Sequence, residues 1–82
     1  MDYTVSLKPR AQKDLKGLPK EIQQRTIEAL EKLQDNLTGD VKKLTNHSPE
    51  YRLRVGRYRV LFEVEGSLVV VYRVLHRSKA YQ

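Results

Sequence analysis

The strongest constraint on the fold lies in residues 51–77, where three apolar runs rich in β-branched and aromatic residues are separated by glycine turns. The turns fall at Gly56 and at residues 65–67, so the pattern predicts an antiparallel meander of three strands. The last run is apolar at every position from 68 to 71, which is typical of a strand buried on both faces. We therefore expect this strand to lie inside the sheet.

Alternation of side chains along each strand predicts that arginines gather on one surface of the meander. Arg52 and Arg54 share one face of the first strand, and Arg59 joins them if tight turns pair the strands. Arg77 and Tyr81 follow the last strand and reach the rim of that surface. Arginines this dense repel one another, so the surface is either a solvated face or an anion site. A polyphosphate is the natural occupant of such a site.

The first fifty residues predict one strand and two helices. Residues 3–7 alternate as a strand does, and Pro9 suits the first turn of a helix. A second helix is expected to begin near Pro19 and to end at a C-cap formed by Gly39. Its apolar positions step by three and four: Leu18, Ile22, Thr26, Leu30, Leu33 and Leu37. Residues 41–44 read as a short extended piece within a connection.

The element order β-α-α-β-β-β predicts an α+β fold, with a helical hairpin packed on a mostly antiparallel four-stranded sheet. The 82 residues are expected to form a single domain over 1–82. The chain has no cysteine and only two histidines, His47 and His76, so we expect no disulfide and no metal. No apolar run is long enough to span a bilayer and no signal peptide is evident, so a cytoplasmic protein without a membrane partner is expected.

Positive charge is concentrated in the meander and the C-terminal tail. Residues 50–82 hold seven basic and three acidic residues, a net charge of +4, out of +6 for the whole chain. A basic surface of this kind favours nucleic acid or an acidic protein as partner, and composition does not choose between them.

Several local features occur together in one order: Leu44 before a loop, the run at 51–56, then Tyr58-Arg59-Val60, a valine-rich strand ending at His76-Arg77, and a closing tyrosine, Tyr81. Over the whole chain they resemble the RelE/ParE superfamily of bacterial toxins, and specifically the RelE type. This resemblance implies an endoribonuclease (an mRNA interferase) that enters the ribosomal A site and cuts mRNA without metal or cofactor. The ribose 2′-OH attacks its own 3′ phosphate. The implied partners are the ribosome and mRNA, a cognate acidic RelB-like antitoxin, and operator DNA through the antitoxin complex alone.

The resemblance also implies roles for individual residues. Arg59 matches the strand arginine expected to stabilise the transition state, and Arg77 matches a basic residue beside the scissile phosphate or the leaving oxygen. Arg52 and Arg54 match a basic pair that holds the RNA backbone and helps to activate the nucleophile. Tyr81 matches a C-terminal tyrosine that stacks on a base and orients or deprotonates the 2′-OH. RNA binding is further expected of Arg57, Arg73, Lys42, Lys43 and Lys79.

One departure from the family leaves the general base open. The matching first-strand pair is lysine in well-known relatives, whereas Arg52 and Arg54 stay protonated at any working pH. Either Tyr81 or His76 takes the proton, or catalysis is mainly electrostatic. Alternation places His76 on the face opposite Arg77, against the core.

Two rival functions remain on the same fold. A ParE-like toxin would inhibit DNA gyrase without nuclease activity, and that type lacks the basic set and the tyrosine. A catalytically inactive relative would keep RNA binding alone. Each of these predicts an acidic, partly disordered antitoxin lying across the basic face, where it would cover Arg59, Arg77 and Tyr81.

Overall fold

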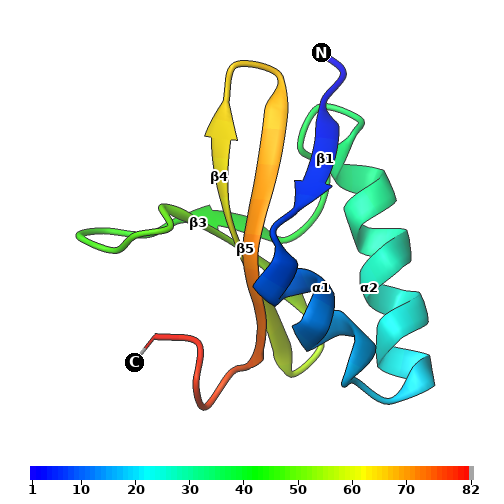
Figure 1. Cartoon of the computed structure of the whole chain (residues 1–82). Coiled ribbons are helices and arrows are strands. Elements are labelled where there is room, and N and C mark those ends of the chain that lie inside the picture. The colour runs from blue at the N-terminus through cyan, green and yellow to red at the C-terminus, as the bar shows by residue number, and fades with distance from the viewer. Residues whose placement is uncertain (82) are drawn as a thin grey trace.

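The computed structural model describes residues 1–81, in which two helices pack on one face of a five-stranded sheet (Figure 1). The elements are β1 (Thr4–Leu7), α1 (Pro9–Lys16), α2 (Lys20–Leu33), β2 (Val41–Lys43), β3 (Tyr51–Val55), β4 (Tyr58–Glu65) and β5 (Leu68–His76). The strand order is β1-β5-β4-β3-β2, with β1 parallel to β5 and the other neighbours antiparallel. The predicted α+β class and mostly antiparallel sheet are confirmed.

The predicted number of strands was one too few, because the extended piece after the second helix is paired. In β2, Val41 lies opposite Leu53 and Lys43 lies opposite Tyr51, so β2 forms the outer edge of the sheet. Three residues carry too little alternation to predict a strand, and only the backbone of β3 makes them one.

Both helices begin at the predicted prolines, but the second one ends early. Pro9 opens α1 and Pro19 is the N-cap of α2, whose last residue is Leu33. The predicted C-cap at Gly39 is wrong, because Asn36 and the following residue take positive φ angles of 55° and 57°. The N-terminal segment binds the residues that follow the helix, since the Asn36 N–H donates to the Met1 carbonyl at 2.9 Å instead of to a helix carbonyl. In the described chain neither helix has the length and apolar content needed to cross a membrane.

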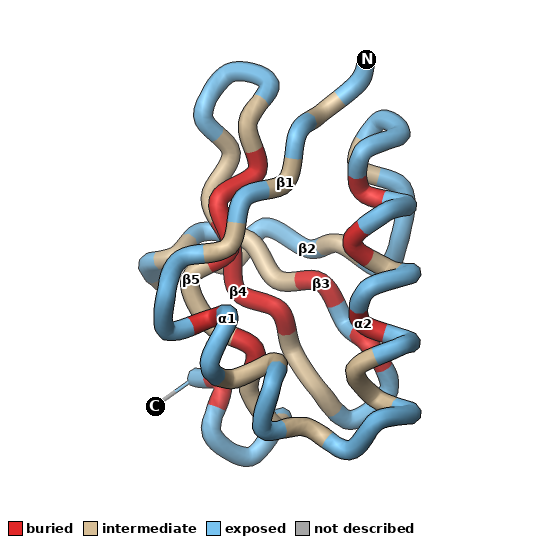
Figure 2. Tube along the Cα trace, turned by 45° about the vertical axis from the view of Figure 1, so that its right-hand side comes forward, coloured by how far each residue is buried: buried red, intermediate tan, exposed pale blue. Residues whose placement is uncertain are grey.

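The core lies between the helices and the covered face of the sheet, as the buried segments in Figure 2 show. Phe62 is fully buried and stacks on Tyr51 with ring centroids 5.5 Å apart. The fully buried members are Ala11, Leu33, Val60, Phe62, Val69 and Val71. Val60 and Phe62 of β4 belong to the core, and β5 lies inside the sheet as predicted.

A register shift opposite Leu61 and Phe62 interrupts the pairing of β4 with β5. Leu61 lies opposite Arg73, whereas Phe62 lies opposite Val71, so one residue of β5 is left unpaired. An extra residue of this kind bends a strand and changes the direction of the side chains that follow. The side chains at the end of β5 therefore cannot be placed by counting from its beginning.

Candidate functional site

The face of the sheet turned away from the helices carries the arginines in adjacent cross-strand rows. Arg54 lies opposite Arg59, which in turn lies opposite Leu75 on β5. In the next row Arg52 lies opposite Leu61. Directly opposite residues share a face and have neighbouring side chains. The predicted grouping of Arg52, Arg54 and Arg59 on one surface is thus present in the structure.

These arginines line a shallow hollow of about 320 Å³, which we call the cationic hollow. Its lining residues are Lys42, Leu44, Arg52, Arg54, Arg59 and Tyr81. Four positive side chains therefore converge from β2, β3 and β4, with one aromatic ring from the C-terminal tail. Such an arrangement suits a ligand that carries several negative charges and a flat ring.

Arg59 is held in place by backbone carbonyl groups rather than by an acid. Its Nη1 donates to the carbonyl oxygens of Gly56 at 3.1 Å and Tyr58 at 3.0 Å. Within residues 1–81 it forms no ion pair, so its positive charge is not neutralised by a bonded carboxylate. A guanidinium fixed in this way can meet an anion without first breaking a salt bridge.

Arg52 and Arg54, in contrast, both pair with Asp40, which directly precedes β2. Arg52 Nη1 lies 3.1 Å from Asp40 Oδ1, and Arg54 Nε lies 3.4 Å from Asp40 Oδ2. The hydrogen bond from Arg52 is the main cause that lowers the pKa of Asp40, and the charges of Arg54 and Arg59 add to it. Nothing in the sequence pattern singles out Asp40, because its position depends on the pairing of β2 with β3.

Tyr81 reaches the cationic hollow from the tail and is held there by a histidine. Tyr81 is 48% exposed, and its ring meets the His47 ring edge to face, with centroids 5.8 Å apart. His47 Nδ1 lies 2.9 Å from the Pro49 carbonyl oxygen, which requires a proton on Nδ1. The neighbouring Ala80 is buried, so Ala80, and not Tyr81, packs into the protein at this edge of the structure. The sequence pattern does not reveal the contact of His47 with Tyr81, because the two residues come from distant segments.

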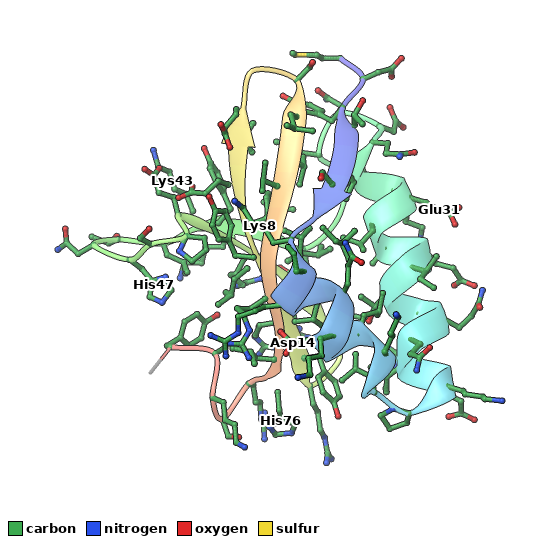
Figure 3. All side chains as sticks on the ribbon, viewed as in Figure 1. Lys8, Asp14, Glu31, Lys43, His47 and His76 are labelled. Atoms are coloured by element: carbon green, nitrogen blue, oxygen red, sulfur yellow. The ribbon has the colours of Figure 1, made fainter. Side chains whose placement is uncertain are left out.

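His76 and Arg77 lie outside the cationic hollow. His76 is opposite Tyr58 in the register, and the two rings meet edge to face at 5.4 Å. Since Val60 and Val74 are a buried pair in the same register, His76 lies on the helix-covered side, away from the cationic hollow. Figure 3 shows it at the end of β5, well apart from His47. Arg77 is exposed, donates its backbone N–H to the Arg57 carbonyl at 2.8 Å, and is not among the described residues that line the hollow.

The remaining basic residues are divided among other surroundings. Lys42 lines the cationic hollow, but Lys43 points to Glu50 at 3.6 Å. Lys79 lines a second hollow of about 390 Å³ together with His47. Arg57 is exposed beside the β3–β4 turn. The structure thus brings together Arg52, Arg54, Arg59, Lys42 and Tyr81 from the predicted set.

Arg73 has a structural partner in the first helix. Its Nε and Nη2 donate to the two carboxylate oxygens of Asp14 at 2.7 and 3.1 Å, and the Val74 N–H donates to Asp14 at 3.0 Å. Burial alone would raise the pKa of Asp14, but the hydrogen bonds from Arg73 and Val74 outweigh burial, so this pKa is lowered. The same bond raises the pKa of Arg73. Arg73 therefore ties α1 to β5.

The Asp14–Arg73 bridge predicts a specific acid dependence of stability. We expect Asp14→Asn to lower the free energy of unfolding at neutral pH by about 1.5–3 kcal/mol, the range for hydrogen bonds to charged groups. Because the pKa of Asp14 is lowered in the folded state, this contribution is present above the unfolded value of 3.8 and is lost as pH falls through the folded pKa. Urea unfolding at several pH values measures it. The exposed Asp35→Asn serves as control, and a difference that persists in acid would contradict the charge argument.

Comparison with known proteins identifies the family to which the chain belongs. A family model described as the ParE toxin of type II toxin–antitoxin systems, parDE, matches residues 5–81. The match covers nearly the whole chain, so the chain belongs to this family of toxins.

Several relatives of the chain carry the name RelE. A toxin named RelE3 from Methanocaldococcus jannaschii is 39% identical over 74 residues, which cover 84% of each chain. A solved RelB–RelE antitoxin–toxin complex from Methanococcus jannaschii contains a chain 37% identical, with a TM-score of 0.74 and coverage of 88% and 89%. The toxin–antitoxin complex RelBE2 from Mycobacterium tuberculosis matches at 30% identity, a TM-score of 0.80 and coverage of 94% and 100%. The RelE-type resemblance seen in the sequence is therefore confirmed.

Proposed function

We propose that this toxin is a ribosome-dependent mRNA endoribonuclease that works without a metal ion. The observation that carries the proposal is the cationic hollow, where three arginines and Lys42 converge beside the exposed ring of Tyr81. Phosphate groups supply the negative charges that such a cluster attracts, and an unstacked base supplies a flat partner for the tyrosine. RNA in a ribosomal A site offers both. We accordingly take the ribosome, its mRNA and the cytoplasm as the setting of the reaction.

The proposed reaction is an internal displacement at phosphorus. The ribose 2′-oxygen attacks the adjacent phosphate, the bond from phosphorus to the 5′-oxygen breaks, and a 2′,3′-cyclic phosphate and a 5′-hydroxyl result. The 2′-oxygen loses a proton and the 5′-oxygen gains one, so the reaction consumes no co-reactant. Negative charge accumulates on the non-bridging oxygens in the transition state, where fixed positive donors are most effective.

Arg59 has the best geometry for that role. It is already held by the Gly56 and Tyr58 carbonyl groups and is not paired with an acid among the described residues, so little reorganisation is needed as charge develops. Arg52 and Arg54 lie two positions apart on the exposed face of β3, and there they hold the RNA backbone. Arg77, Arg57 and Lys79 lie outside the hollow, and we assign them to flanking phosphates or to ribosomal RNA.

Tyr81 is our candidate for orienting the 2′-hydroxyl. It is the titratable side chain that reaches the hollow without a fixed positive charge, whereas His76 lies on the opposite side of the sheet. Because Arg52 and Arg54 remain protonated, the proton passes to Tyr81 or to solvent while the arginines supply electrostatic stabilisation.

The solved relatives are RelB–RelE complexes, and we propose an acidic RelB-like antitoxin for this chain as well. Its natural target is the cationic hollow, since covering Arg59 and Tyr81 would block RNA and neutralise part of the net charge of +6. We expect contact with operator DNA only through the toxin–antitoxin complex.

Inducing the toxin in growing bacteria and mapping mRNA 5′ ends by primer extension tests the proposed function. Cuts inside translated codons are expected for the wild type and for the control Arg10→Ala, an exposed arginine on α1. They should disappear in the double variant Arg52→Ala/Arg54→Ala. Growth arrest with intact mRNA and damaged DNA would instead favour gyrase inhibition, the ParE-like alternative. RNA binding without cuts would favour an inactive relative.

His47 should matter through its contact with Tyr81. Removing the ring by His47→Ala is expected to lower the cleavage rate about threefold to tenfold, the worth of one aromatic pair. His47→Phe keeps an aromatic ring at this position and should restore most of the rate. Cleavage of a ribosome-bound message in vitro measures both variants. Equal losses in the two variants would show that an imidazole nitrogen, rather than the ring contact, is required.

A further inference from the structure

Asp40 pairs with two arginines that line the cationic hollow, while Asp40 itself lines a neighbouring hollow beside α2. The two oxygens of Asp40 meet Arg52 Nη1 at 3.1 Å and Arg54 Nε at 3.4 Å. A phosphate group would offer the same two arginines the same kind of oxygen. Asp40 therefore occupies positions on the arginines that a phosphate would otherwise take.

The backbone around Asp40 does not depend on its carboxylate. The Asp40 carbonyl oxygen accepts from Arg52 Nη1 at 2.8 Å and from the Arg54 N–H at 3.0 Å. These bonds hold β2 beside β3 whether or not the side chain is paired. The carboxylate side chain is 53% exposed, so it can turn into solvent when another anion arrives.

We propose that Asp40 is an internal competitor for phosphate that sets which anions the cationic hollow accepts. This inference rests on the proposed function, because it takes the RNA backbone as the ligand. A single phosphate only exchanges one anion for another on Arg52 and Arg54. A nucleic-acid backbone also meets Arg59 and Lys42, which Asp40 leaves unpaired, and so it outcompetes the carboxylate. Asp40 is thus a specificity-determining residue that favours polyanions over small anions.

A purely structural salt bridge makes the opposite prediction. If Asp40 served only to fasten β2 to β3, removing its charge would loosen two arginines of the hollow and weaken RNA binding. If Asp40 competes with phosphate, removing its charge frees those arginines and tightens binding. The direction of the change therefore separates the two roles.

The test measures affinity for a 2′-O-methylated oligouridine, which lacks the attacking hydroxyl and cannot be cut. We expect Asp40→Asn to bind about two- to fivefold more tightly than wild type, the worth of one exposed ion pair. Inorganic phosphate should gain affinity as well. Asp40→Glu, which keeps the charge, should bind as wild type does.

Glu65→Gln is the matched control, because it removes the same charge at the far β4–β5 turn. Tightening in Asp40→Asn no greater than in Glu65→Gln, or weakening, would overturn the proposal. If circular dichroism shows that Asp40→Asn does not fold, NMR of the wild-type protein tests the competitor role instead. The Arg54 Nε–H signal must then shift when the oligouridine binds, and an unchanged signal would overturn the proposal.

The two hypotheses fail separately. Wild-type protein that never cuts mRNA would end the proposed ribonuclease function, even if Asp40→Asn bound the oligouridine more tightly. Cuts inside translated codons by wild type together with unchanged binding by Asp40→Asn would end only the competitor role.

Discussion

Replacing Arg59 by alanine is expected to lower the rate of mRNA cleavage on the ribosome by about 10²–10³-fold, the usual cost of removing one fixed donor to a developing oxyanion. The guanidinium is already oriented by two backbone carbonyl groups, so its loss removes a preorganised charge. Binding of uncut RNA should fall much less, because Arg52, Arg54 and Lys42 remain. Single-turnover cleavage and equilibrium binding, measured on the same variant, separate the two effects.

Arg59→Lys refines this prediction. Lysine keeps the charge but not the planar fork, so we expect it to recover part of the rate and not all of it. Arg10→Ala changes net charge equally and should leave the rate near wild type. An Arg59→Ala protein that cleaves normally would remove Arg59 from the reaction and would recast the hollow as a binding surface only.

Replacing Tyr81 by alanine is expected to cost about 10²–10³-fold in cleavage rate. Stacking on an unpaired base contributes about 1–3 kcal/mol, and proton transfer by a positioned group adds further acceleration. Both depend on the exposed ring at the mouth of the hollow. Alanine removes the two contributions together, so we expect Tyr81→Ala to lose more activity than Tyr81→Phe.

Tyr81→Phe divides the two contributions because it keeps the ring and removes the hydroxyl. We expect an intermediate loss of cleavage rate, with RNA affinity retained, if the hydroxyl orients the 2′-OH or accepts its proton. A phenylalanine variant as active as wild type would assign Tyr81 to stacking alone and leave the proton to solvent. Unchanged activity in Tyr81→Ala would exclude the tyrosine from the site altogether.

The strand pattern predicted the meander well, because side-chain direction in a strand is a local property. Leu53 and Val55 are buried while Arg54 is exposed, as alternation required. Helix starts were equally accessible, since Pro9 and Pro19 act on their own neighbours. The helix end was not: α2 stops at Leu33 where the N-terminal segment bonds to the residues that follow it, and no local signal records that contact.

The partners of the individual basic residues were the least predictable part of the site. Arg73 matches the same charge pattern as its neighbours, yet it binds Asp14, which lies 59 positions away in the chain. Pairing of Asp40 with two arginines required the short edge strand β2, and the contact between His47 and Tyr81 joins a loop to the tail. Sequence periodicity carries no information on such partners.

By itself the sequence determined the α+β class, the interior position of β5 and the gathering of Arg52, Arg54 and Arg59 on one sheet surface. Backbone geometry and apolar spacing are sufficient for these features, because each depends on residues a few positions apart. Only the tertiary structure decided which of the positive charges remain available to an anion. That choice depends on strand register and packing, which bring acids and rings from distant segments to some arginines and not to others.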